Sequence, residues 1–132
     1  MSSATNWLQF AREDLRVAEW ALDETINNQA CFHSQQCVEK SLKAWLVSQG
    51  KAPPRVHQLA TLLSLIPGEL VDDLIDGIEL LDQFYIPTRY PDALVSSLPD
   101  GPPSDHQARH AVVTARKVLQ RVEQHISTQP SR

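Results

Sequence analysis

The sequence lacks any long hydrophobic run, because none of its apolar stretches approaches the roughly 18 residues that a membrane-spanning helix needs. Its N-terminal segment, residues 1–6, has no basic cluster and no hydrophobic core, so no secretory signal is expected there. No segment has the pattern of a strand, and no internal repeat is visible. A chain of 132 residues provides for one domain. We therefore expect one all-helical, cytoplasmic domain over residues 1–127, with a frayed tail at residues 128–132.

Cysteine is scarce, and the two in the chain are Cys31 and Cys37. They lie six positions apart within one predicted helix, which separates their Cα atoms by about 9 Å at a rise of about 1.5 Å per residue. A disulfide needs Cα atoms within about 7 Å of each other. The two cysteines are therefore predicted to be free thiols, which fits a reducing compartment.

Basic residues are outnumbered, with 12 Lys and Arg against 16 Asp and Glu, for a formal net charge of −4. This balance argues against broad binding to a phosphate backbone, which needs a basic face. The charges are also unevenly distributed: residues 69–82 contain six acids and no base, whereas residues 105–125 contain four bases and two acids. We expect these two segments to pack side by side, with the acids forming a solvated face or, alternatively, a partner surface.

Apolar residues recur at three- and four-residue spacing, the period of amphipathic helices, through most of the chain. Asn28 is predicted as the N-cap of the second helix and Gly50 as its stop, while Ser104 and Gln107 form a capping box before the last helix. Four long helices and one short helix, joined by short connections, predict an antiparallel four-helix up-and-down bundle with one additional short helix. The predicted helices span about residues 5–23, 28–49, 59–65, 69–84 and 104–127.

The second helix carries a glutamine on its core face. At about 100° per residue, Gln35 projects into the same sector as Cys31, Val38 and Leu42. An unpaired glutamine there would cost about 1–3 kcal/mol, so Gln35 needs polar partners inside the bundle or at a cleft. The opposite side of the helix is interpreted either as a solvated polar face or as a stripe that binds an anionic ligand or a partner. That stripe consists of His33, Gln36, Lys40 and Lys43.

Three sequence motifs together resemble the HEPN domain (higher eukaryotes and prokaryotes nucleotide-binding). They are the run Gln36-x-x-Glu-Lys-x-Leu-Lys-Ala44 on the second helix, the Pro-Pro-Arg-x-His-Gln-Leu run at 53–59, and Tyr-Ile-Pro-Thr-Arg-Tyr-Pro-Asp at 85–92. The resemblance covers nearly the whole chain, from residue 11 to the last helix. It implies a bundle of four up-and-down helices with a short extra helix, usually dimeric.

The resemblance implies two possible roles. One is that of a nucleotide-binding protein or partner subunit of a small nucleotidyltransferase, sometimes within a toxin–antitoxin pair. The other is that of an RNA-cleaving toxin, and that branch carries Arg-(four to six residues)-His on its last helix. This chain departs from that pattern, since the nearest approach, Arg121 to His125, has only three intervening residues. A phosphate-binding arginine and a proton-transferring histidine are both needed for such cleavage. We therefore predict binding without catalytic residues or a cofactor, with a ribonuclease of non-standard residue set or a ligand-free structural bundle as alternatives.

The resemblance also implies a set of ligand-binding residues. Lys40, Lys43 and Arg89 would supply positive charge to phosphates, and the tyrosines would stack on a base. Each of these residues also has a structural alternative. Arg89 would hydrogen-bond the second helix and hold its own loop against it, and the tyrosines would pack as anchors. His57 would cap the third helix. The full predicted set is Gln36, Glu39, Lys40, Lys43, His57, Tyr85, Arg89 and Tyr90, followed by Pro91 of the loop motif.

Metal binding and thiol chemistry receive little support from the sequence. His33 with Cys37, and His106 with His110, each place two metal-capable side chains on one helical face. A structural zinc needs four ligands, and the sequence places no third or fourth beside either pair. Cys37 has no base partner in the sequence apart from His33, so no nucleophilic thiol and no metal site are predicted.

Overall fold

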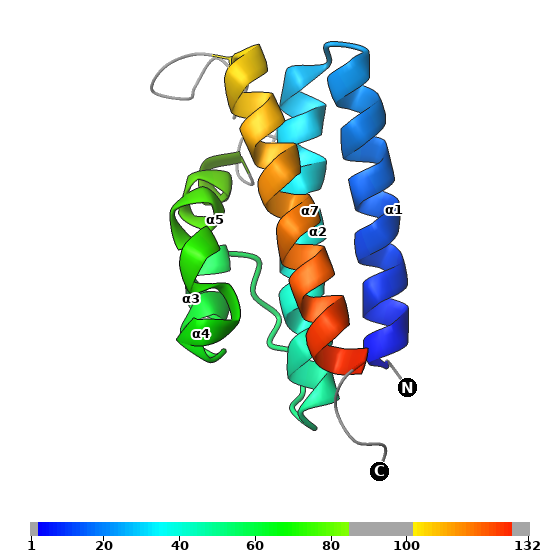
Figure 1. Cartoon of the computed structure of the whole chain (residues 1–132), viewed down its shortest axis with the longest axis vertical. Coiled ribbons are helices and arrows are strands. Elements are labelled where there is room, and N and C mark those ends of the chain that lie inside the picture. Colours follow the sequence, from blue (N-terminus) through cyan, green and yellow to red (C-terminus); the bar gives the residue numbers. More distant parts are fainter. Residues whose placement is uncertain (1–2, 85–101, 128–132) are drawn as a thin grey trace.

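The computed structural model describes residues 3–84 and 102–127 of the chain. Three long helices lie side by side along its longest axis, and a series of short helices covers the side away from α1 (Figure 1). The long helices are α1 (Ala4–Asp23), α2 (Asn27–Ser48) and α7 (Asp105–Ser127). The short ones are α3 (Leu59–Leu63), α4 (Gly68–Val71) and α5 (Ile75–Leu81). In the part of the chain described, no helix has the length and apolar character needed to span a membrane.

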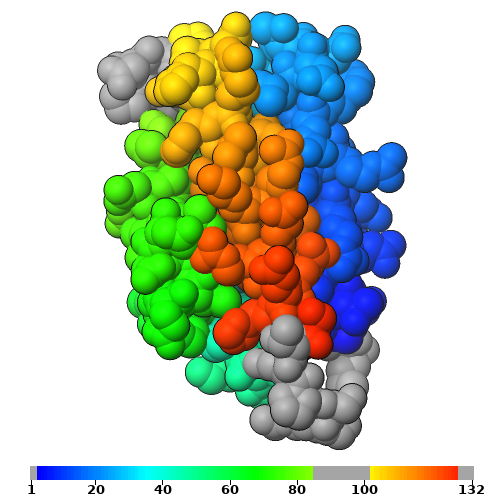
Figure 2. All heavy atoms as spheres, in the orientation of Figure 1, coloured from blue at the N-terminus to red at the C-terminus, as the bar shows by residue number. Residues whose placement is uncertain are grey.

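Contacts between the long helices fix their relative directions. Two contacts between α2 and α7 each join residues 78 positions apart, so these two helices run parallel: Asn27 to Asp105, and Cys37 to Ala115. Two ion pairs between α1 and α7 occur in reverse order along the two helices, so this pair is antiparallel: Arg12 to Glu123, and Glu19 to Arg116. Figure 2 shows α7 in the middle of one face, with α1 on one side and the short helices on the other. The predicted all-helical up-and-down bundle is confirmed.

The segment predicted as one helix over 69–84 is interrupted. It consists of α4, a 3₁₀ turn at Asp72–Leu74, α5 and a second 3₁₀ turn at Asp82–Phe84. In an uninterrupted helix the carbonyl oxygen of Leu70 would accept the amide of Leu74. Here the Leu70 carbonyl accepts a hydrogen bond from Nη1 of Arg121 on α7, at 3.0 Å. The prediction of a fourth long helix is therefore wrong, although the broken segment fills the fourth position of the bundle.

The helix ends follow the predicted signals in two of three places. Ser104 and Gln107 form the reciprocal capping box, with bonds of 2.8 and 3.1 Å. Gly50 follows α2 with a φ of +78°, and the amides of Gly50 and Lys51 return to the last turn as in a Schellman motif. The predicted N-cap at Asn28 is wrong, because α2 begins at Asn27 after Ile26. The side chain of Asn27 instead bonds Asp105, at the start of α7, over 2.7 Å.

The acidic segment lies against basic α7, as the charge distribution predicts. Arg121 makes a two-bond ion pair with Asp73, and these hydrogen bonds lower the pKa of the Asp73 carboxyl. Asp82 is an exception to the predicted solvated face. Its two carboxylate oxygens accept the backbone amides of Leu59 and Ala60 at 2.6 and 2.9 Å. Asp82 therefore fills the capping role at α3 that the sequence allowed for His57.

Candidate functional site

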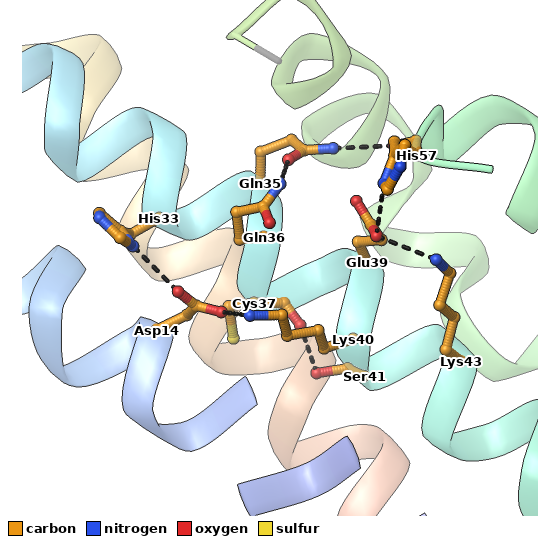
Figure 3. Close-up of polar contacts among 10 residues, drawn as sticks. All are labelled: Asp14, His33, Gln35, Gln36, Cys37, Glu39, Lys40, Ser41, Lys43 and His57. Carbon is orange, nitrogen blue, oxygen red and sulfur yellow. Dashed lines mark hydrogen bonds and ion pairs between the residues drawn. The ribbon is translucent and has the colours of Figure 1, made fainter. Parts of the chain in front are cut away.

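The inward position predicted for Gln35 is confirmed, and its partners lie within the bundle. Gln35 is 0% exposed. Its Nε2 donates to the backbone carbonyl of His57, 22 residues away, at 3.0 Å, and its Oε1 accepts Nε2 of Gln36 at 2.6 Å (Figure 3). Both functional atoms of the amide are therefore paired, which removes the penalty of burying it. Gln35 thereby holds the segment before α3 against α2.

A buried carboxylate lies one helical turn beyond Gln35. Oε2 of Glu39 is 3.0 Å from Nζ of Lys43 and 3.0 Å from Nδ1 of His57. Both Glu39 and Lys43 are buried, and Lys43 also lies 5.6 Å above the centre of the Trp7 ring. Because a buried carboxylate needs a counter-charge, Lys43 and Glu39 stabilise each other in the interior. Figure 3 shows Glu39 between Lys43 and His57.

A second ion-paired group lies where α1 meets α2. Oδ1 of Asp14 is 2.9 Å from Nδ1 of His33, and its Oδ2 is 2.6 Å from Nζ of Lys40. The His33–Lys43 stripe is only partly a solvated face, because α1 contacts it: Lys43 is buried, and the side chains of His33 and Lys40 are 24% and 27% exposed. Asp14 is not among the site residues predicted from the sequence. The available signal was an acid three residues after Ala11 and four before Ala18, on the apolar stripe of the first helix.

We call Gln35, Gln36, Glu39, Lys40, Lys43 and His57 the α2 polar cluster. Three of its members reach the surface: Gln36 is half-buried, the side chain of Lys40 is 27% exposed, and that of His57 is 44% exposed. Among residues 3–84 and 102–127, buried Oε1 of Glu39 has no hydrogen-bond partner. A buried carboxylate oxygen without a partner can still accept a hydrogen bond from a donor.

The predicted loop residues Tyr85, Arg89, Tyr90 and Pro91 lie outside the described residues. The described chain nevertheless reaches the neighbourhood of the cluster just before them. Asp82 bonds the amide of Leu59, only two residues after His57.

Both cysteines are free, as predicted, and both are buried. Desolvation by burial raises the pKa of each thiol to about 12. A nucleophilic cysteine needs a thiolate near neutral pH. The structure therefore gives no support to thiol chemistry at Cys37.

The histidines near the start of α7 lie apart from the α2 polar cluster. His106 and His110 border a groove of about 190 Å³ between α5 and α7, over an apolar floor that includes Leu81 and Phe84. Within the described ranges, no three or more His, Cys, Asp or Glu side chains gather as metal ligands would. On the same helix, Arg116 and Arg121 are held in ion pairs with Glu19 and Asp73.

Comparison with known proteins connects this geometry to a family. The sequence matches the family model of the HEPN domain over residues 4–125. A protein of Methanocaldococcus jannaschii named "Putative toxin MJ1304" is 31% identical over an alignment of 100 residues, and the match covers 70% of this chain and 66% of that protein. The chain thus spans slightly less than two thirds of that relative's length.

Two crystal structures share the fold over nearly their whole length. TT1696 from Thermus thermophilus superposes with a TM-score of 0.78 at 35% sequence identity, over 94% of this chain and 98% of that one. ST0689, described as an archaeal HEPN homologue, superposes with a TM-score of 0.76 at 32% identity, over 96% and 99% of the two chains. The comparison of structures and the comparison of sequences therefore point to the same family.

Proposed function

The chain belongs to the HEPN domain family, and from this membership we propose that it is a binding protein whose α2 polar cluster takes a nucleotide. We further propose that it acts as the partner subunit of a small nucleotidyltransferase, and that two copies of the chain associate. The similarity to a protein named as a toxin supports a place in a toxin–antitoxin-like pair.

The observation that carries the nucleotide proposal is the state of Glu39. Its carboxylate is buried, one oxygen is bonded to Lys43 and His57, and the other has no partner among the residues described. A ribose hydroxyl or the amino group of a base would supply the missing donor. Lys40, whose side chain is 27% exposed, would attract phosphate, and Arg89 and the tyrosines of the loop would complete the site.

The structural alternative uses the same oxygen of Glu39. If the guanidinium of Arg89 bonds it, the loop is pinned to α2 and no donor from a ligand is needed. The two cases differ in what Arg89 contributes. In the first case, removing Arg89 weakens ligand binding. In the second case, removing Arg89 lowers the stability of the fold, and there is no ligand binding to weaken.

Titration calorimetry with ATP and GTP tests the proposal. We expect heat of binding for at least one nucleotide, with affinity lowered about tenfold or more by Arg89→Ala or Lys40→Ala, since each removes a charge-assisted contact of about 1.5–3 kcal/mol. Lys117→Ala, at an exposed position on α7, is the matched control and should leave affinity unchanged. No heat at millimolar nucleotide would support the purely structural bundle instead.

The ribonuclease alternative is less well supported. Arg116 and Arg121 are engaged in ion pairs that join α7 to the rest of the bundle. We expect no RNA cleavage above a buffer control. Cleavage that disappears on replacing His106, His110 or His125 would overturn the binding-only proposal. A neighbouring gene for a small nucleotidyltransferase, and co-purification of its product with this chain, would support the partner role.

A further inference from the structure

A backbone carbonyl fixes the orientation of two side-chain amides in the α2 polar cluster. The carbonyl oxygen of His57 can only accept a hydrogen bond, so the atom of Gln35 that lies 3.0 Å from it must be Nε2. Oε1 of the buried Gln35 therefore faces Gln36 and accepts Nε2 of that side chain at 2.6 Å. Since each bond determines the next, Oε1 of Gln36 is left as an acceptor. No other residue in the described ranges donates a hydrogen bond to it.

The unpaired atom of Glu39 is an acceptor as well. Glu39 is 3% exposed, and its Oε2 lies 3.0 Å from both Lys43 and His57. Its Oε1 has no partner within the part of the chain that the structure describes. A carboxylate carries no hydrogen to donate. The unused hydrogen-bonding capacity of Gln36 and Glu39 therefore consists of two acceptor oxygens and no donor.

These two acceptors belong to neighbouring side chains. Gln36 and Glu39 are three positions apart on α2, which places their Cβ atoms about 5–6 Å from each other. Figure 3 shows Gln36 next to Gln35, and Glu39 next to His57. Gln36 is half-buried whereas Glu39 is buried, so a ligand would approach from the side of Gln36. A group that bonds both oxygens has to present two donors side by side.

The common bases differ in the donors that they carry on the edge used for base pairing. Guanine carries N1–H and the N2 amino group next to each other. Adenine and cytosine each carry one amino group beside an acceptor nitrogen, and uracil carries one N–H between two carbonyl oxygens. An acceptor placed against Oε1 of Glu39 would be repelled and would leave that buried oxygen unpaired. Guanine is therefore the common base whose edge matches two adjacent acceptors.

We propose that the α2 polar cluster selects guanine nucleotides, with Oε1 of Glu39 and Oε1 of Gln36 accepting the N1–H and the N2 amino group of the base. The inference rests on the nucleotide binding proposed above and adds the identity of the base. Gln35 is a positioning residue in this arrangement, because its bond to the His57 carbonyl decides that Gln36 offers an oxygen rather than an amino group.

Titration calorimetry of the full chain with GTP, inosine triphosphate and ATP tests the selection. Inosine triphosphate keeps N1–H and lacks the N2 amino group. We expect it to bind about tenfold more weakly than GTP, because one hydrogen bond is lost. We expect ATP to bind at least about a hundredfold more weakly, because its edge does not present the two adjacent donors.

The outcomes of this titration separate the inference from the proposed function. Equal affinities for GTP and ATP would overturn the selection of guanine and leave nucleotide binding in place. No heat with any of the three nucleotides at millimolar concentration would contradict the proposed function itself, and the inference with it.

The variant Gln36→Leu tests the role given to the amide oxygen. It removes one of the two acceptors, so the ratio of GTP affinity to ATP affinity should fall about tenfold. Both affinities are measured on the same variant, so a partial loss of folding would lower both and leave the ratio unchanged. Gln120→Leu, the same substitution at an exposed position of α7, is the matched control and should keep the wild-type ratio. A wild-type ratio in Gln36→Leu would overturn the proposed recognition of the base.

Discussion

The side-chain amide of Gln35 donates to the backbone carbonyl of His57 at 3.0 Å, which ties the middle of α2 to the chain just before α3. This bond places the imidazole of His57, whose side chain is 44% exposed, beside Glu39. The arrangement of the other residues in the α2 polar cluster therefore depends on Gln35, which would not itself contact a ligand.

Replacing Gln35 by leucine should destabilise the fold. Leucine fills similar space but leaves the His57 carbonyl and Nε2 of Gln36 without their partner, at a cost of about 1–3 kcal/mol. Urea unfolding measures the change. Gln120→Leu, the same substitution at an exposed position of α7, should alter stability by no more than about 0.5 kcal/mol. Equal effects of the two substitutions would contradict the role given to Gln35.

Glu39 and Lys43 should behave as a coupled pair. Glu39→Gln leaves the ammonium of Lys43 buried without its counter-charge, and we expect a loss of about 3–5 kcal/mol. The double variant with Lys43→Met removes both charges and should recover most of that loss. Glu123→Gln, which breaks the more exposed pair with Arg12, should cost about 0–1 kcal/mol. Additive losses in the double-mutant cycle would show that the two side chains act independently.

Helical periodicity predicts which side chains of α2 belong to the polar cluster. It does not predict the groups on other segments with which they pair. The three- and four-residue spacing of α2 places Gln35 beside Val38 and Leu42, and the structure confirms it. The carbonyl that pairs with Gln35 comes from a segment 22 residues away, which spacing within one helix does not identify.

Two of the departures from the sequence predictions have the same kind of cause. The break after α4 coincides with a hydrogen bond from Arg121, 51 residues further along the chain. The polar stripe of α2 is partly covered because Asp14 and Trp7 of α1 contact it. In each case a contact between helices overrides a pattern that describes one helix alone.

The cysteines should be almost unreactive in the folded protein. Burial raises the pKa of both thiols to about 12, so at pH 8 the thiolate fraction is about one in ten thousand, against about one in ten for a thiol with a pKa of 9.0. Alkylation by iodoacetamide, followed by mass spectrometry, should therefore be about a thousandfold slower than in concentrated guanidinium chloride. Rapid modification of either cysteine in the native state would contradict this burial.

Gly77 marks the close approach of α5 to α7. A Cβ at this position would lie 2.5 Å from Oγ1 and 3.0 Å from Cγ2 of buried Thr114. We expect Gly77→Ala to destabilise by about 1–3 kcal/mol, and the double variant with Thr114→Ala to recover part of the loss because both clashing atoms are gone. Gly68→Ala has open space around it and should be neutral or slightly stabilising. Thermal unfolding compares the three variants, and a neutral Gly77→Ala would mean that the helices separate easily.

Proton NMR of the five histidines during addition of ATP or GTP tests whether the α2 polar cluster binds a nucleotide. We expect the imidazole signals of His57, a member of the α2 polar cluster, and of His33, which shares Asp14 with Lys40, to shift together along one saturation curve. The signals of His106 and His110, in the groove between α5 and α7, should stay unchanged. Shifts at His106 and His110 with none at His57, or no shift at any histidine at millimolar nucleotide, would contradict this binding.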